Sequence, residues 1–325
     1  MKAWQCHRFG EPMELAIAEL PVPQPGAGEV RLRVCAAGFG FGETLVLKGR
    51  YQKTPDLPYV PCSEMSGWID ACGEGVADFA VGERVAAFDV SLRGGGLAQY
   101  CVLPARFVHR LPAHVDLVDA AGFLMNHWTA FNALVRRGML QQGEVLVVHG
   151  ATGGTAAAAI DVARAIGARI IAVGGDDERL AGLRADHVIN HRRSSVRDEI
   201  LALTDGRGAD VFFDPVGGDA FDASMRAIAP GGRILVVGFA SGQPAVARTN
   251  VVLVKMISII GVEARLALER TGDVGWADFQ EMLRWLEAGR IGPSPTLRIT
   301  FDEAVAGLQS LLERRHTGKC VVVVA

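Results

Sequence analysis

The sequence has no large excess of either charge. Its 33 Lys and Arg residues are balanced by 36 Asp and Glu residues, which leaves a formal net charge of -3. Basic residues form only short pairs such as Arg192-Arg193. A protein that binds nucleic acid must neutralise many phosphates, so nucleic acid is not an expected partner.

Long hydrophobic runs are also missing. The most apolar stretch, residues 250–262, contains Lys255 and is too short to cross a bilayer. Residues 1–8 carry charged side chains and lack the apolar core of a secretory signal. We therefore expect a cytoplasmic protein that does not bind membranes.

The six cysteines lack the spacing of a metal site. They stand at positions 6, 35, 62, 72, 101 and 320, with no Cys-x-x-Cys pair and no His at zinc-ligand spacing beside them. We expect buried thiols in a reducing compartment. For Cys62 a second interpretation stays open, in which the thiol lines a substrate cleft.

The length of 325 residues exceeds what one hydrophobic core usually holds, so we expect two domains. In the first 110 residues, short β-rich runs alternate with turns that are rich in Gly and Pro. These runs are 30–34, 67–70, 84–88 and 100–103. Their spacing predicts an all-β, partly closed barrel.

A regular alternation of strands and helices begins at Glu144. The expected strands are 145–149, 169–173, 187–190, 211–214, 233–238 and 257–261, with helices at 155–166, 177–183, 196–203 and 219–228. This alternation predicts an α/β domain with a doubly wound parallel sheet. Two more helices, 276–288 and 302–314, precede a valine-rich strand at 320–324, which we expect to dock into the first domain.

A glycine-rich turn separates the first strand of this series from an Ala-rich helix. Its residues are Gly150, Ala151, Thr152, Gly153, Gly154 and Thr155. Such a turn lets the backbone approach a pyrophosphate, and the helix N-terminus supplies free N–H groups. We therefore predict a nicotinamide dinucleotide site. The alternatives are a turn without ligand and a methyltransferase, which usually has an acid where Val147 and Val148 stand.

The end of the second strand favours NADPH over NADH. Gly174 follows this strand directly, where an NAD enzyme carries the acid that binds the ribose diol. Arg179 and Arg192 are the cations that we expect at a 2′-phosphate, although Arg179 also suits a solvated helix face. Asp176 and Asp177 would repel a phosphate unless they point away from it.

Over its full length the chain resembles the medium-chain dehydrogenases/reductases, and within them the zinc-independent quinone oxidoreductase branch. The matching stretches are 1–4, 21–26, 150–154, 186–190, 213–218 and 229–233. The resemblance implies a GroES-like, partly closed β-barrel domain at 1–120 and 263–325, and a Rossmann dinucleotide-binding domain at 121–262. It also implies a homodimer that pairs through the apolar last strand of the nucleotide sheet, 257–261.

The same resemblance implies a reductase without zinc. Zinc alcohol dehydrogenases of this superfamily bind their metal through a Cys after the second barrel strand and through a Gly-His-Glu sequence. This chain has Gly40 and Cys62-Ser63-Glu64 at those positions, so only Glu64 remains of about three protein ligands that catalytic zinc needs. The implied chemistry is hydride transfer from NADPH to a quinone or an α,β-unsaturated carbonyl compound.

The resemblance also implies individual site residues. Tyr51 is the expected proton donor, and Asn126 and His127 are expected to hydrogen-bond a substrate oxygen. Besides the glycine turn, the expected cofactor contacts are Thr129, Gly174, Arg179, Arg192, Gly238, Phe239, Ala240 and Lys319. Packing alone remains the alternative for Tyr51 and His127, and exposure to solvent remains the alternative for Lys319.

Three positions depart from the quinone reductase pattern. Gly40 replaces a usual Asn, Glu43 replaces a common Asp, and Cys62 replaces a usual Gly. Two alternatives to a quinone or enone reductase therefore stay open. One is a homologue that binds NADPH but has lost the chemistry, and the other is an alcohol dehydrogenase that works without metal.

Overall fold

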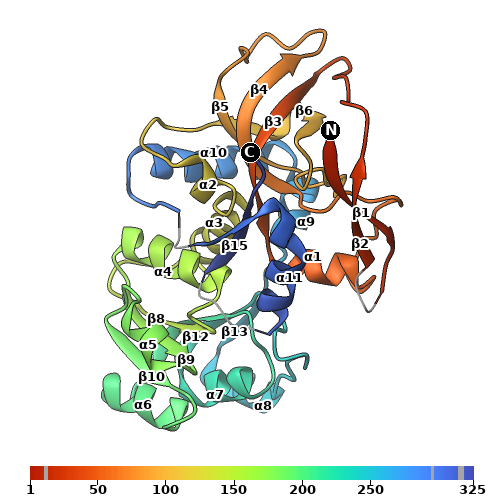
Figure 1. Cartoon of the computed structure of the whole chain (residues 1–325). Helices are drawn as coiled ribbons and strands as arrows, with labels where there is room; N and C mark the ends of the chain where they lie inside the picture. Colours follow the sequence, from red (N-terminus) through yellow and green to blue (C-terminus); the bar gives the residue numbers. More distant parts are fainter. Residues whose placement is uncertain (11–13, 294–295, 314–317) are drawn as a thin grey trace. The chain divides into compact units, whose positions relative to one another are not determined.

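The chain divides into two units, each built on its own sheet (Figure 1). The computed structural model describes residues 1–10, 14–293, 296–313 and 318–325. Unit 1 comprises Met1–Met125 and Pro293–Ala325, and unit 2 comprises Asn126–Gly292.

Unit 1 contains a mostly antiparallel sheet of seven strands in the order β14-β15-β3-β4-β5-β7, with β6 paired to β3, and a separate β1-β2 pair. The strands are β1 (Lys2–Arg8), β2 (Glu14–Glu19), β3 (Glu29–Phe39), β4 (Glu64–Cys72), β5 (Arg84–Phe88), β6 (Tyr100–Pro104), β7 (Val108–Arg110), β14 (Thr296–Thr300) and β15 (Lys319–Val323). The helices are α1 (Phe41–Leu47), α2 (Leu117–Ala120) and α11 (Ala304–Leu312), with 3-10 turns at Ala105–Phe107 and Phe301–Glu303. Alternate residues of β3, such as Val30, Leu32 and Val34, are fully buried, as expected of a strand with one face in the core.

The C-terminal strand is part of the unit 1 sheet. β15 pairs antiparallel with β3, where Cys320 lies opposite Phe39 and Val323 lies opposite Ala36, and it pairs parallel with β14. The expected docking of the valine-rich strand into the first domain is confirmed. The predicted helix 302–314 corresponds to α11, and its residue 314 lies outside the described residues.

Unit 2 contains a six-stranded sheet in the order β10-β9-β8-β11-β12-β13, in which every pair is parallel. The strands are β8 (Val145–His149), β9 (Arg169–Gly174), β10 (His187–Asn190), β11 (Ala209–Asp214), β12 (Ile228–Val236) and β13 (Ser258–Gly261). The helices are α3 (Leu124–Phe131, beginning in unit 1), a π-helical turn (Asn132–Arg137), α4 (Gly154–Ile166), α5 (Asp177–Ala181), α6 (Val196–Leu203), α7 (Asp219–Ala227), α8 (Thr249–Lys255), α9 (Ala264–Thr271) and α10 (Asp273–Glu287). Helices α5 and α6 contact β10, whereas α7 contacts β11 and β12, and α8 contacts β12 (Figure 1). The predicted doubly wound α/β domain is confirmed.

The boundary between the units differs from the expected one. Residues 263–292 were expected in the first domain, but α9 and α10 pack in unit 2. The Trp128 indole Nε1 donates a hydrogen bond to Ala264 O at 2.7 Å, and its ring lies 5.5 Å from that of Phe279. These contacts between α3 and the two helices bury their apolar faces inside unit 2.

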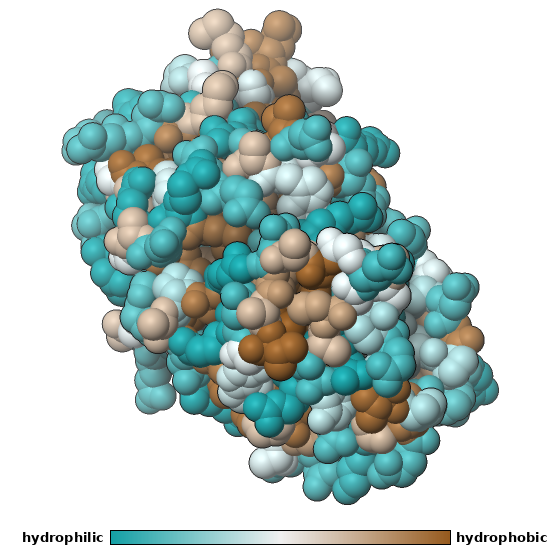
Figure 2. Space-filling model, turned by 90° about the horizontal axis from the view of Figure 1, so that it is seen from above, coloured by the Kyte–Doolittle hydropathy of each residue, from teal (hydrophilic) through white to brown (hydrophobic). Residues whose placement is uncertain are grey.

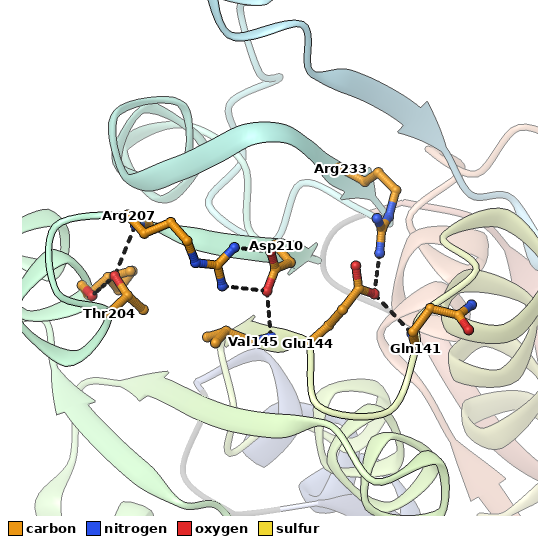
Figure 3. A network of polar contacts seen from close by, with 9 residues as sticks. Gln141, Glu144, Val145, Thr204, Arg207, Asp210 and Arg233 are labelled. Atoms are coloured by element: carbon orange, nitrogen blue, oxygen red, sulfur yellow. Dashed lines mark hydrogen bonds and ion pairs between the residues drawn. The ribbon is translucent and has the colours of Figure 1, made fainter.

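An ion pair from β12 and a hydrogen bond to β11 meet at the N-terminal end of β8 (Figure 3). Arg233 of β12 pairs with Glu144, and Arg207 pairs with Asp210, which also accepts a hydrogen bond from Val145 N at 2.8 Å. The hydrogen bond from Arg207 holds the pKa of Asp210 below its ordinary value. Ligands bind at the opposite, carboxyl ends of strands in such sheets, so this network is structural.

No helix in the described part of the chain is long and apolar enough to span a membrane. On the face drawn in Figure 2, apolar side chains lie in small groups between hydrophilic ones. Around α8, by contrast, Leu253 and Val254 are 78% and 79% exposed.

His109 of β7 provides a test of this packing. Burial lowers the pKa of its imidazole from 6.5 to about 4, so the folded protein keeps it neutral where the unfolded chain protonates it. The free energy of unfolding should therefore fall by about 3 kcal/mol as the pH drops through this window, with no effect of His109 above it. Denaturant titrations at neutral pH and near pH 4 measure this change. Between the two pH values, His109→Gln should lose less free energy of unfolding than the wild-type protein. Equal losses in both proteins would contradict the burial of a neutral imidazole.

Candidate active site

The glycine-rich turn lies between β8 and α4. Gly150 has a φ of +58°, and a Cβ at this position would lie 3.1 Å from Val216 Cγ2, so glycine is favoured here. Ala151 N donates a hydrogen bond to the end of β9, and Gly153 N donates one to Gly150 O at 2.9 Å. Gly153 is also the N-cap of α4 and has no side chain to cap the helix. The first N–H groups of α4 therefore remain available to an anion.

A second turn packs against the glycine turn. Asp214, the last residue of β11, is buried, and its Oδ1 accepts hydrogen bonds from Val216 N at 2.8 Å and Gly217 N at 2.9 Å. Ala240 N donates a hydrogen bond to Pro215 O at 3.0 Å. The expected cofactor loop consists of Gly238, Phe239 and Ala240. This loop therefore lies on the turn that contacts Gly150.

His149 fixes the strand end in front of the glycine turn. Its Nε2 lies 2.8 Å from Ser224 Oγ of α7, and its ring stacks on Phe212 with the centroids 5.9 Å apart. Burial lowers the pKa of His149, an effect that the Asp214 carboxylate opposes. We interpret His149 as a neutral internal residue that holds α7 on the sheet.

The end of β9 shows why no acid follows this strand. A Cβ at Gly174 would lie 2.9 Å from Leu180 Cδ2, so Leu180 fills the space beside it. A Cβ at Gly175 would lie 3.0 Å from Arg192 Nε. A cavity of about 370 Å³ opens here, and Arg192 lines it, whereas Arg179 does not.

Asp176 and Asp177 also line this cavity, and both have protein partners. Asp176 caps α5 by accepting a hydrogen bond from Arg179 N at 3.0 Å, and its Oδ2 lies 3.7 Å from Arg179 Nε. Asp177 accepts a hydrogen bond from Asn190 Nδ2 at 2.6 Å and pairs with the arginine that follows Arg192. Among the residues that the structure describes, no carboxylate pairs with Arg192. Arg192 is therefore the better placed of the two expected cations.

The α3 candidates are held by contacts within unit 2. Thr155 Oγ1 of the glycine turn donates a hydrogen bond to Asn126 Oδ1 at 3.2 Å. His127 is fully buried, and its Nε2 lies 3.4 Å from Asp161 Oδ2 of α4. Thr129 is also buried. The structure thus joins Asn126 to the glycine turn and puts His127 in the packing between α3 and α4.

The unit 1 candidates border the start of α1. Lys319 Nζ forms an ion pair with Glu64 Oε2 at 2.6 Å, and their side chains are 5% and 3% exposed. A Cβ at Gly40 would lie 3.5 Å from Lys319 Nζ, and one at Gly42 would lie 3.6 Å from Tyr51 Cε2. The alternative of a solvent-exposed Lys319 does not hold, and its contact with a cofactor stays a prediction.

A buried tyrosine lies close to these residues in the fold. Tyr59 OH donates a hydrogen bond to Glu43 Oε1 at 3.0 Å. Burial raises the pKa of Tyr59 well above its ordinary value, and the negative charge of Glu43 raises it further. Cys62 is fully buried with a φ of +70°, and burial raises the pKa of its thiol. In the sequence, only the departures at Glu43 and Cys62 point to this cluster.

These residues do not fit a catalytic zinc ion. Glu64 Oε2 binds the Lys319 ammonium, whose positive charge would repel a metal, and Glu64 Oε1 accepts a hydrogen bond from Met125 N at 3.0 Å. Gly40 has no side chain that could bind a metal. Within the described ranges, no group of three or more His, Cys, Asp or Glu residues is arranged to hold a metal ion.

Comparison with known proteins finds the same two parts in the chain. The alcohol dehydrogenase GroES-like domain model matches residues 26–113, and the zinc-binding dehydrogenase model matches residues 154–288. Quinone oxidoreductase-like protein 2 of Rattus norvegicus is 32% identical over 99% of this chain and 91% of its own length. The quinone oxidoreductase of Homo sapiens is 31% identical over 97% of this chain and 91% of its own.

Solved structures share the whole fold. A quinone oxidoreductase of Pseudomonas syringae pv. Tomato DC3000 is similar with a TM-score of 0.89 and 26% identity over 99% of both chains. An NAD-dependent alcohol dehydrogenase has a TM-score of 0.89 and 30% identity over 100% of both chains. A mycobacterial protein solved with NADPH has a TM-score of 0.87 and 26% identity over 100% of both chains. The GroES-like and Rossmann parts of the fold are thereby confirmed, and the chain belongs to the medium-chain dehydrogenase/reductase superfamily, in its quinone oxidoreductase branch.

Proposed function

We propose that the protein is an NADPH-dependent reductase of quinones or α,β-unsaturated carbonyl compounds that works without metal. The observation that carries the cofactor assignment is the Arg192 guanidinium, which lines a cavity at the end of β9 with no carboxylate partner in the described chain. A 2′-phosphate distinguishes NADPH from NADH, and a guanidinium binds such a group through charge-assisted hydrogen bonds.

The other cofactor contacts follow from the ends of the parallel strands. The glycine turn and the free N–H groups of α4 suit the pyrophosphate. The Gly238 to Ala240 loop and Thr129 are proposed to line the nicotinamide end. When bound, NADPH supplies a hydride to the acceptor and is released as NADP⁺.

The residues of unit 1 support an acceptor that needs no Lewis acid. The Glu64 carboxylate is neutralised by Lys319 and is not free to hold a metal. A conjugated carbonyl or a quinone already has an electrophilic atom, so hydrogen-bond donors suffice to stabilise the charge that develops on its oxygen. Tyr51 is the proposed proton donor. The names of the relatives in the quinone oxidoreductase branch agree with this acceptor class.

A metal-free alcohol dehydrogenase is the second candidate, because one similar structure is of an NAD-dependent alcohol dehydrogenase. Steady-state assays with the purified protein distinguish the two. We expect oxidation of NADPH with members of a quinone panel or an enone panel, and no reduction of NADP⁺ by simple alcohols. Alcohol oxidation alone would favour the second candidate. Binding of NADPH without turnover on any panel would indicate a homologue that has lost the chemistry.

Arg192→Gln tests the cofactor assignment. The KM for NADPH should rise about 10- to 100-fold, because a charge-assisted hydrogen bond to the 2′-phosphate is lost. The KM for NADH should not change. The matched control is Arg197→Gln in α6, which removes only an exposed ion pair with Asp198. Equal effects of Arg192→Gln on both cofactors would contradict a 2′-phosphate site.

We also propose a homodimer that pairs through β13. This strand lies at the edge of the unit 2 sheet and pairs only with β12 among the described strands. Next to it in the sequence, Leu253, Val254 and Met256 are 74–79% exposed. An exposed strand edge beside apolar side chains favours pairing with a second copy.

Light scattering measures the oligomeric state directly. The wild-type protein should have the mass of a dimer, and Leu253→Glu/Val254→Glu should shift it toward the monomer by burying charge at the interface. Circular dichroism of the variant checks that the fold is retained. A monomeric wild-type protein would contradict the proposed dimer.

A further inference from the structure

We propose that the Lys319 ammonium, held in place by Glu64, stabilises the negative charge on the acceptor oxygen, at the position where zinc enzymes of the superfamily hold their metal. The proposal rests on the reductase function proposed above and assigns its oxyanion-binding group. Lys319 would be a catalytic residue that touches the acceptor, and Glu64 a positioning residue that acts through it.

The lysine side chain reaches its position along a path lined by glycine. A Cβ at Gly122 would lie 3.0 Å from Lys319 Cγ, and one at Gly38 would lie 3.1 Å from Lys319 Cε. The positions beside the stem therefore leave no room for larger side chains. At its end, Glu64 Oε2 binds the ammonium while Glu64 Oε1 is held by Met125 N. Both partners of the ion pair are thus fixed in the fold.

The ammonium retains hydrogen-bonding capacity. A lysine has three N–H donors, and Glu64 is its only hydrogen-bond acceptor within the described residues. The side chain is 95% buried, so water is largely excluded from its donors. Buried donors without partners are costly, and an anionic oxygen would satisfy them.

Gly40 keeps one approach to the ammonium clear of side-chain atoms. A Cβ here would already be in van der Waals contact with Lys319 Nζ, at 3.5 Å. The zinc enzymes carry a Cys ligand at this position, and the quinone reductases usually carry an Asn. In this chain, Gly40 instead leaves room beside the Lys319 ammonium. The ring of Tyr51 lies against Gly42, two residues along. Lys319 and Tyr51 therefore both border the Gly40–Gly42 backbone.

The reduction balances with these groups. The hydride brings two electrons and one hydrogen to the electrophilic atom of the acceptor. The π electrons of the conjugated system then move onto the carbonyl oxygen, which becomes an enolate or hydroquinone anion. Lys319 donates a hydrogen bond to this oxygen and keeps its proton. One proton, from Tyr51 with replacement from water, completes the saturated carbonyl compound or the hydroquinone.

Removal of the charge pair as a whole tests the role without leaving a lone buried charge. In Lys319→Met/Glu64→Gln we expect kcat with an enone to fall by ~10²- to 10³-fold, the loss typical of an oxyanion donor. The rates are compared at saturating NADPH, because Lys319 is also an expected cofactor contact. The loss should be smaller with electron-poor quinones, whose anions need less stabilisation. An unchanged kcat would overturn the proposal.

Binding of substituted phenols provides a readout that does not depend on turnover. Phenolates mimic the oxyanion, and absorbance reports whether the bound phenol is ionised. The wild-type protein should lower the pKa of the bound phenol and bind the phenolate about tenfold or more tightly than the double variant. Arg233→Met/Glu144→Gln, which removes the ion pair shown in Figure 3, is the matched control. It should lose stability but keep phenolate binding and kcat.

The outcomes separate this proposal from the reductase function. If the wild-type protein fails to oxidise NADPH with any acceptor tested, the reductase function is contradicted. Phenolate binding still reports on Lys319 in that case. If the double variant does not fold, the wild-type titration alone decides. An unshifted pKa of the bound phenol would then overturn the role of Lys319.

Discussion

A buried ammonium must have a partner, and this constraint organises the candidate site in unit 1. Lys319 opens the last strand of the chain and Glu64 opens β4, so their ion pair joins two strands that are 255 residues apart in the sequence. Glu64 also binds the backbone at Met125, next to the point where the chain enters unit 2. The same carboxylate that would remain as a zinc ligand is thereby committed to a cation. Our proposal of metal-free chemistry rests on this ion pair.

In unit 2, the corresponding constraint is the close approach of two turns at the carboxyl ends of β8 and β11. Asp214 shapes one turn through two backbone N–H groups, and Val216 packs it against Gly150 in the other. Nothing larger than hydrogen fits easily at Gly150, so the backbone of the glycine turn remains accessible. The carboxyl edge of the sheet therefore offers N–H groups for a pyrophosphate after β8, and the Arg192 guanidinium beside the end of β9. The proposed preference for NADPH requires Arg192 to bind the 2′-phosphate while the glycine turn binds the pyrophosphate.

Much of the fold could be predicted, because the strand-helix alternation and the valine-rich C-terminal strand depend on residues that are close together in the sequence. The assignment of residues 263–292 to the first domain differs from the structure, since the contact of Trp128 with Phe279 leaves no local signal. For the same reason the partner of Lys319 was not foreseeable. The acid missing at Gly174 was visible in the sequence, but its physical reason, the packing of Leu180, was not. Sequence alone also left open the partners of Asp176 and Asp177, which bind Arg179 N and Asn190 Nδ2 and line the cavity beside Arg192.

Metal independence and hydride transfer are tested together by transient oxidation of NADPH in protein that has been dialysed against a strong chelator. Rapid mixing with a quinone or an enone, followed by the absorbance of NADPH, gives the rate of the reductive step. Because Glu64 is paired with Lys319, this rate should equal that of untreated protein, and added zinc should not increase it. A rate that is lost on chelation and restored by zinc would contradict the metal-free site, and so would the absence of NADPH oxidation with every acceptor.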